Sequence, residues 1–161
     1  MGPAFCRAWR KRNSNSNAIS GSGGLIKSGT GKLVLTQDAS YTGTTQVLGG
    51  SLSSAKSLAS AVNIGRAGTL DVRTVKGNVD NSGFVLLRDG KTRFARAYTQ
   101  RTTGTRAFML GSTLDVAGRA TLAGNLHLVG VPTVYVTQAR QPVVNAGAVS
   151  GRFSRFTQSA G

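Results

Sequence analysis

The stretch from residue 21 to residue 52, GSGGLIKSGTGKLVLTQDASYTGTTQVLGGSL, decides the fold of this chain. Successive side chains of a strand point to opposite faces. Leu33 and Leu35 therefore lie on one face of an extended segment, and Lys32, Val34 and Thr36 lie on the other. Residues that favour turns flank this strand at 28–31 and at 38–43. The stretch therefore predicts short β-strands separated by tight turns.

The phrase Gly-x-Leu recurs along the chain at a nearly constant interval. It begins at Gly31, Gly50 and Gly68, which are 19 and 18 residues apart. Repeats of this length are typical of solenoid proteins, in which each repeat forms one coil stacked on its neighbours. The repeat predicts a parallel β-solenoid of roughly five to seven coils.

The same alternation predicts which side chains point into the coil. The inward positions that we expect between residues 61 and 87 are Val62, Ile64, Leu70, Val72, Val75, Val79, Phe84 and Leu86. Residues 53–61, SSAKSLASA, lack helix caps and are too short for a stable helix, so we expect a loop or one short turn there. Further short strands are expected around 114–116, 121–128, 134–136 and 143–153.

Residues 21–52 resemble the passenger-associated repeat of bacterial autotransporters, which has the form G-x-G-x-L-x-K-x-G-x-G-x-L-x-L…Y-x-G-x-T-x-V…G-x-L. About a dozen positions agree in order, whereas a single Gly-x-Leu would carry little information. The matching positions are Leu25, Lys27, Gly29, Gly31, Leu33, Leu35, Tyr41, Gly43, Thr45, Val47, Gly50 and Leu52.

The resemblance continues towards the C-terminus. Gly68, Leu70 and Val72 fit the strand that follows the repeat in this family. The last third is similar to the end of a passenger just ahead of its membrane barrel, as in autotransporters that carry a subtilisin-type protease. The residues that we assign to the repeated structure there are Leu114, Val116, Gly124, Leu126, Leu128, Gly147, Gly151 and Phe153.

This resemblance implies an all-β fold, a right-handed parallel β-helix over residues 21–156, with 157–161 as a truncated end. It also implies a place at the cell surface, either attached to the outer membrane or secreted. In a full-length parent the same β-helix would continue and an outer-membrane β-barrel would follow. The segment would be a monomeric, non-catalytic stalk that presents an upstream module, expected to be a serine protease, and that assists folding during secretion.

Residues 1–20 differ from the rest of the chain. Four cations, Arg7, Arg10, Lys11 and Arg12, precede a polar run, and the order of features that makes a secretory signal is missing. We expect a disordered basic tail or a misassigned start codon, with a nucleic-acid-binding arm as the alternative. Cys6 is the single cysteine of the sequence, so neither a disulfide within the chain nor a cysteine metal site is predicted.

The chain carries 20 Lys and Arg against five acids, a formal charge of +15. Such a charge suits either a solvated surface or a polyanion partner, such as an anionic glycan or lipopolysaccharide. No stretch alternates cations with aromatic residues, so specific nucleic-acid binding is not expected. Residues 88–106 are the most basic segment, and we expect a strand with its cations facing water there, with phosphate binding as the alternative.

No constellation of catalytic residues is found in the sequence. His127 is the one histidine, and its alternation with two leucines predicts that it points outward. The sequence lacks a G-x-S-x-G elbow, a complete phosphate-binding loop and a cluster of aspartates, so we predict no enzyme activity, cofactor or metal. Three functions stay open: a stalk, an adhesin or polyanion-binding surface, and a truncated gene remnant.

Overall fold

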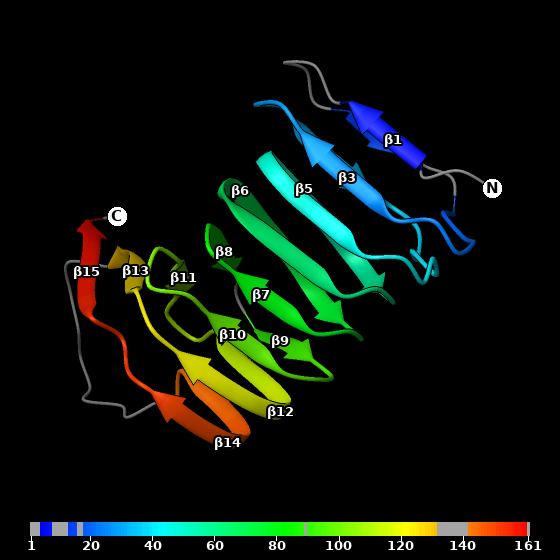
Figure 1. The fold of residues 1–161 in the computed structure, drawn as a ribbon. Helices are drawn as coiled ribbons and strands as arrows, with labels where there is room; N and C mark the ends of the chain where they lie inside the picture. Colours follow the sequence, from blue (N-terminus) through cyan, green and yellow to red (C-terminus); the bar gives the residue numbers. More distant parts are fainter. Residues whose placement is uncertain (1–3, 8–12, 16–17, 89, 132–141, 161) are drawn as a thin grey trace.

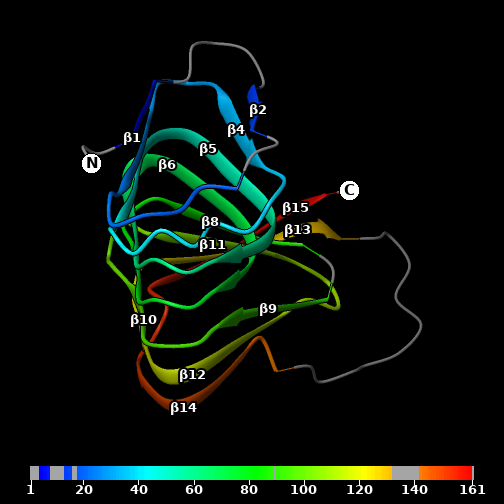
Figure 2. The same cartoon turned by 90° about the vertical axis from the view of Figure 1, so that its right-hand side faces the viewer.

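The computed structural model describes residues 4–7, 13–15, 18–88, 90–131 and 142–160, and all its regular elements are β-strands. The pairings between these strands are all parallel. The strands of successive coils lie side by side from β1 at one end to β14 and β15 at the other (Figure 1). Viewed from a second direction, the chain winds round in successive coils (Figure 2). This arrangement confirms the predicted all-β solenoid.

Each coil has three faces, which we call the first, second and third in chain order. The first face holds β1 (Ala4–Arg7), β3 (Leu25–Ser28), β7 (Val79–Asn81) and β10 (Tyr98–Gln100). The second face holds β2 (Asn13–Asn15), β4 (Lys32–Leu35), β8 (Phe84–Leu87), β11 (Thr105–Met109), β13 (Asn125–Val131) and β15 (Arg155–Ala160). The third face holds β9 (Lys91–Phe94).

Four longer strands bend round the corners between faces. β5 (Thr45–Leu58) and β6 (Val62–Val75) run across all three faces, and their pairing shifts register at the corners. β12 (Thr113–Leu122) and β14 (Val144–Gly151) run from the third face of one coil into the first face of the next. A continuous chain of strand pairs therefore connects one coil to the next.

The strand register gives the number of coils. Equivalent positions on the first face are Leu25, Thr45, Val62, Val79, Tyr98 and Ala120. These positions span five coils, and β14 and β15 extend the stack beyond them. The number agrees with the predicted five to seven.

Aliphatic side chains stack in columns inside the coils. On the second face Leu33, Leu52, Leu70 and Val85 occupy equivalent positions and are all buried. Parallel strands lie about 4.8 Å apart, so side chains in one column are in contact from coil to coil. Burying each of them contributes about 1.5–3 kcal/mol, which makes these columns the main source of stability. The predicted inward positions from Val62 to Val79 are confirmed as buried.

Glycines fill corners where no other residue fits. Gly50 has a φ of 63°, and a Cβ there would collide with the carbonyl oxygens of Gly29 and Gly31. Gly68 has an ordinary φ, but a Cβ would strike the carbonyl oxygen of Val47 in the preceding coil. The glycines of the Gly-x-Leu phrase thus allow one coil to approach the next closely.

The prediction for Phe84 and Leu86 is wrong by one residue. In β8 the buried side chains are Val85 and Leu87, and the two predicted ones are partly exposed on the outer side. Leu70 pairs with Val85, so the corner at Gly83 uses one residue more than expected. A shift of one residue moves every side chain of a strand to the opposite face.

The loop expected at 53–61 is also wrong for most of its length. β5 continues through Leu58, with Leu52, Ser54 and Leu58 buried. Ser53, Ser54 and Ser57 of this segment pair with β6, so a neighbouring strand stabilises an extended conformation that these residues favour only weakly on their own.

The predicted disordered tail differs from the described parts of residues 1–20. β1 pairs with β3, β2 pairs with β4, and Ile19 bridges to Ala39, so these parts occupy the same three faces as a further coil. Parallel pairing uses backbone groups, which the edge of the β3 coil offers to any extended segment. The domain boundaries at 1–20, 21–156 and 157–161 remain predictions, and the strand expected at 134–136 lies outside the described residues.

Replacement of Leu70 by alanine should destabilise the protein by about 2–5 kcal/mol, because it opens a cavity in the middle of a column. Urea unfolding followed by circular dichroism measures this loss. Thr69→Ala, one residue away on the outer side of the same strand, is the control and should change stability by less than about 0.5 kcal/mol. Equal effects of the two substitutions would contradict the stacked columns.

Candidate functional site

The predicted repeat residues form a structural site inside the coils. Their larger side chains are buried: Leu25, Lys27, Leu33, Leu35, Tyr41, Thr45, Val47, Leu52, Leu70, Val72, Leu114 and Val116. Leu126, Leu128 and Phe153 are partly buried against the same core. The structure therefore brings these residues together as columns.

Lys27 is the unexpected member of this set because its side chain is fully buried. Its Nζ donates hydrogen bonds to the carbonyl oxygens of Ser28 at 2.9 Å, Gly29 at 3.0 Å and Gly49 at 2.9 Å. Ser28 and Gly29 belong to one corner and Gly49 belongs to the corner of the next coil. The ammonium group thus joins two successive corners. It supplies hydrogen-bond donors to corner carbonyl oxygens that have no partner in the strand pairing.

Further polar side chains satisfy one another within the interior. Tyr41 hydrogen-bonds Thr45, whose hydroxyl lies 2.6 Å from that of Ser60. Three coils further on, the Tyr98 hydroxyl donates to Gln100 Oε1 at 2.9 Å and accepts from Asn81. Desolvation raises the pKa of Tyr98 to about 12, so its phenol is neutral at physiological pH.

Asn81 and Gln100 occupy the position in their coils that Lys27 has in its own. Asn81 Oδ1 accepts a hydrogen bond from the backbone of Gly83 at 3.1 Å, and Gln100 Nε2 donates to the carbonyls of Gly104 and Asn125. Each coil with a polar residue here uses it to hold the following corner. The position is therefore a corner-holding site.

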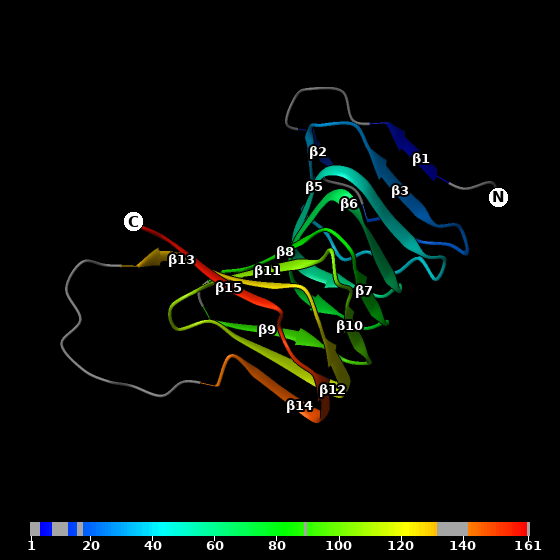
Figure 3. The same cartoon turned by 60° about the vertical axis from the view of Figure 1, so that its left-hand side comes forward.

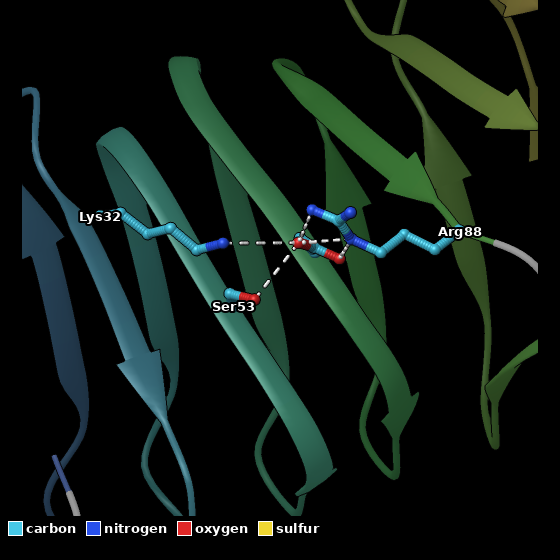
Figure 4. A network of polar contacts seen from close by, with 4 residues as sticks. Lys32, Ser53 and Arg88 are labelled. Atoms are coloured by element: carbon cyan, nitrogen blue, oxygen red, sulfur yellow. Dashed lines mark hydrogen bonds and ion pairs between the residues drawn. The ribbon is translucent and has the colours of Figure 1, made fainter. Parts of the chain in front are cut away.

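On the outer surface of the second face, Lys32, Ser53 and Arg88 converge on one carboxylate (Figure 4), which belongs to Asp71. Arg88 Nε and Nη2 donate to both carboxylate oxygens at 2.8–2.9 Å, and Ser53 Oγ donates at 3.2 Å. Lys32 Nζ lies 3.9 Å away. These bonds raise the pKa of Arg88 above its ordinary value. The network links four successive coils across the surface, but its arginine is exposed and its contribution to stability is small.

Among the described residues of the first two faces, the cations do not form one ladder. The outward ladder of the first face runs Ile26, Gln46, Asn63, Asp80, Thr99, Thr121 and Ser150, without a cation. Asp80 of this ladder binds Arg101 from the adjacent corner. On the second face, Arg88 is paired with Asp71. A polyanion site would need several neighbouring unpaired cations, and these two faces do not provide one.

The prediction that the cations of residues 88–106 all face water is wrong for Arg106. Its side chain is fully buried in the second-face column, although Arg88, Arg93, Arg96 and Arg101 are exposed as expected. Alternation in β11 places residue 106 on the same side as Phe108, which is inward. This alternation was the signal that could have identified the burial of Arg106.

His127 pairs with a hydroxyl group of the neighbouring strand. It is half-buried in β13, and its Nδ1 lies 2.7 Å from Thr157 Oγ1 in β15. Among the described residues no three His, Cys, Asp or Glu side chains gather as metal ligands. The same residues include no helix that is long and apolar enough to cross a membrane.

The fold and its corner residues define the segment as a β-helix built from repeats. Residues 25–53 match the family described as passenger-associated-transport-repeat, and they contain the Lys27 corner and the first columns. This match covers most of the stretch in which the sequence predicted the repeat. No solved structure matches this one.

Over 154 residues the chain is 31% identical to the Neisserial autotransporter lipoprotein NalP of Neisseria meningitidis serogroup B, strain MC58. The same protein from strain H44/76, serotype 15, is 31% identical over the same length. The similarity covers 88% of this chain but only 14% of the length of each relative. Both findings confirm the predicted resemblance to an autotransporter passenger.

Replacement of Lys27 by methionine should destabilise the protein by about 2–4 kcal/mol, because it leaves buried corner carbonyls without a donor. Chemical unfolding measures the loss. Lys76→Met, at an exposed lysine, is the matched control and should change stability by less than about 0.5 kcal/mol. An unchanged stability of Lys27→Met would show that the corner does not need the ammonium group.

Proposed function

We propose that this chain is a non-catalytic stalk segment of an autotransporter passenger, which holds an upstream module at the cell surface or on a secreted product. The observation that carries the proposal is the set of continuous aliphatic columns through parallel coils, within a chain that matches the passenger repeat. Stacked parallel coils form an elongated structure whose length grows with the number of repeats. Such a structure suits a spacer.

We further propose that the upstream module is a serine protease and that a membrane barrel follows in a full-length parent. The similarity to an autotransporter along 88% of the chain supports a larger parent. The protease is inferred from the resemblance of the last third to protease-bearing passengers.

The stalk would also assist folding of the passenger during secretion. Each finished coil presents a row of backbone groups, and an emerging segment pairs with them and adds the next coil. Ordering of this kind uses the free energy of strand pairing and column burial, so it needs no external energy source. The pairing of β5 with β6 over their whole length illustrates how one coil determines the next.

Binding of an anionic glycan or lipopolysaccharide is a weaker candidate. The net charge of +15 favours anions in general. However, Arg88 and Arg101 are each paired with an aspartate, and the first-face ladder carries no cation. The geometry therefore supports the stalk better than a polyanion-binding surface.

An exchange experiment tests the stalk. In a chimaera, the chain replaces the aligned stretch of the N. meningitidis relative. Binding of an antibody against the relative's own residues N-terminal to that stretch, on intact cells, measures how much of the chimaera reaches the surface. We expect display to persist with the unaltered chain and to fall at least about tenfold with Leu52→Asp, because a carboxylate in a buried column opposes coil stacking.

Ser51→Asp is the matched control, since it adds the same charge one residue away on the outer side of β5, opposite Lys32. Its display should equal that of the unaltered chimaera. Full display of Leu52→Asp would contradict the stalk. Hydrolysis of peptides by the purified chain would contradict its non-catalytic character.

A further inference from the structure

Arg106 interrupts an aliphatic column inside the coils. On the second face, β11 lies between β8 and β13 (Figure 3). The equivalent inward positions on this face are Leu33, Leu52, Leu70, Val85, Arg106, Leu126 and Phe156. Arg106 is the one charged side chain among them, and its exposure is 0%. Its two neighbours in the column are aliphatic and offer no hydrogen-bond acceptor from their side chains.

The guanidinium group of Arg106 has no hydrogen-bond acceptor within the described part of the chain. Nε, Nη1 and Nη2 are all buried and without a partner. A guanidinium group carries five N–H donors in a planar fork and accepts no hydrogen bond, so only an acceptor can satisfy it. Burial lowers the pKa of Arg106 to about 10, so the group is protonated at neutral pH. A positive charge therefore lies inside the coil with all its donors unpaired.

The aspartates that the structure describes do not supply the missing negative charge. Asp71 and Asp80 are bound by other arginines on the outer surface, and Asp38 is bound by a serine. Asp115 lies on the outward side of β12, and the sequence contains no glutamate. Tyr98 interacts electrostatically with the guanidinium group, but its phenol is neutral because its pKa is about 12.

Phe153 makes the one favourable contact that the structure gives this charge. The guanidinium carbon lies 5.0 Å from the centre of the Phe153 ring, a cation–π arrangement. A single ring cannot satisfy five N–H donors that point in different directions, and a buried charge without an acceptor costs more than such a contact contributes. Lys27 shows the contrast, because its buried ammonium group donates to three carbonyl oxygens.

The coil between Arg106 and Phe153 has a small interior side chain where the coil before it has a large one. Phe153 directly precedes the β15 coil, which is two strands beyond β11 on the second face. In the coil between them, Ala120 follows Tyr98 in the same inward column. The Phe153 ring is only partly buried at its corner. A small outward shift of this ring therefore makes room for one small ion beside the guanidinium group.

We propose that Arg106 binds one small monovalent anion, of the size of chloride, inside the solenoid at the edge of its guanidinium group. Such an anion supplies both acceptor lone pairs and negative charge, whereas a water molecule supplies only the lone pairs. The anion is enclosed when the coils stack, so it is a structural ligand of the folded chain. This inference concerns the interior of one coil and holds whether or not the chain is a stalk.

Urea unfolding of the full chain at constant ionic strength, with chloride replacing glutamate, tests the site. A ligand that binds only the folded state raises the folding equilibrium constant in proportion to its concentration once this exceeds the Kd. We therefore expect the constant to increase about tenfold for each tenfold increase in chloride above the Kd of the site. A constant that does not change with chloride would overturn the proposal.

Two arginine variants separate the interior site from general effects of salt on a chain with a charge of +15. Arg106→Met keeps a long side chain and removes the interior charge, so the dependence on chloride should be lost. Arg96→Met removes one charge from an exposed position and is the matched control, so its chloride dependence should equal that of the natural chain. A dependence that Arg106→Met retains, or that both variants lose, would contradict the site.

Bromide gives a direct measurement that does not require a stable variant. Crystals of the natural chain, refolded and grown in bromide, should show anomalous scattering from one ion within hydrogen-bond distance of the Arg106 nitrogens. Ordered water in that place, or a guanidinium group without an anomalous peak beside it, would overturn the proposal.

Discussion

Stacking of equivalent side chains in parallel, in-register strands is the constraint on which this structure depends. A single coil buries almost nothing, because its inward side chains lack neighbours above and below it. Once Leu52 lies on Leu33 and Leu70 lies on Leu52, each side chain is enclosed. The columns therefore determine both the parallel pairing and the glycine corners, since coils in contact leave no room for a Cβ at residues such as Gly68.

The interior is not uniformly apolar, and its polar members have a common location. Lys27, Asn81 and Gln100 share one column position just before the first corner, where each donates to a backbone carbonyl oxygen. In two intervening coils the position holds Val47 and Ile64, so the corner can also close without a polar side chain. Arg106 differs from these residues because it lies within a face, away from a corner, and finds an aromatic ring in place of carbonyls.

The sequence was sufficient to predict the repeat, the parallel coils and most inward positions, because alternation and glycine spacing are local features. It failed where a long-range pairing decides the outcome. The corner at Gly83 moves the inward set from Phe84 and Leu86 to Val85 and Leu87, and only the pairing of Leu70 with Val85 reveals this. β1 and β2 form for a similar reason, since their pairing partners lie about 20 residues away.

The buried cations were missed for another reason. For residues 88–106 charge was taken as a sign of exposure, and no face was predicted for Lys27, although alternation placed Lys27 on the side of Leu25 and Arg106 on the side of Phe108. Position in the strand overrides the polarity of a side chain when its neighbours fix the register. A general rule for this fold follows: the face of a residue is read from the alternation first and its chemistry second.

The central claim is that equivalent residues of successive coils lie one strand spacing apart. Spin labels at Ile26→Cys and Thr99→Cys, with Cys6→Ser, occupy one outward ladder four coils apart. Double electron–electron resonance measures the distance between the two labels. After correction for the length of the label side chains, the distances should form a narrow distribution centred at about 19 Å between the two backbone positions. A broad distribution, or a centre beyond about 30 Å, would contradict stacked coils with a strand spacing of that size.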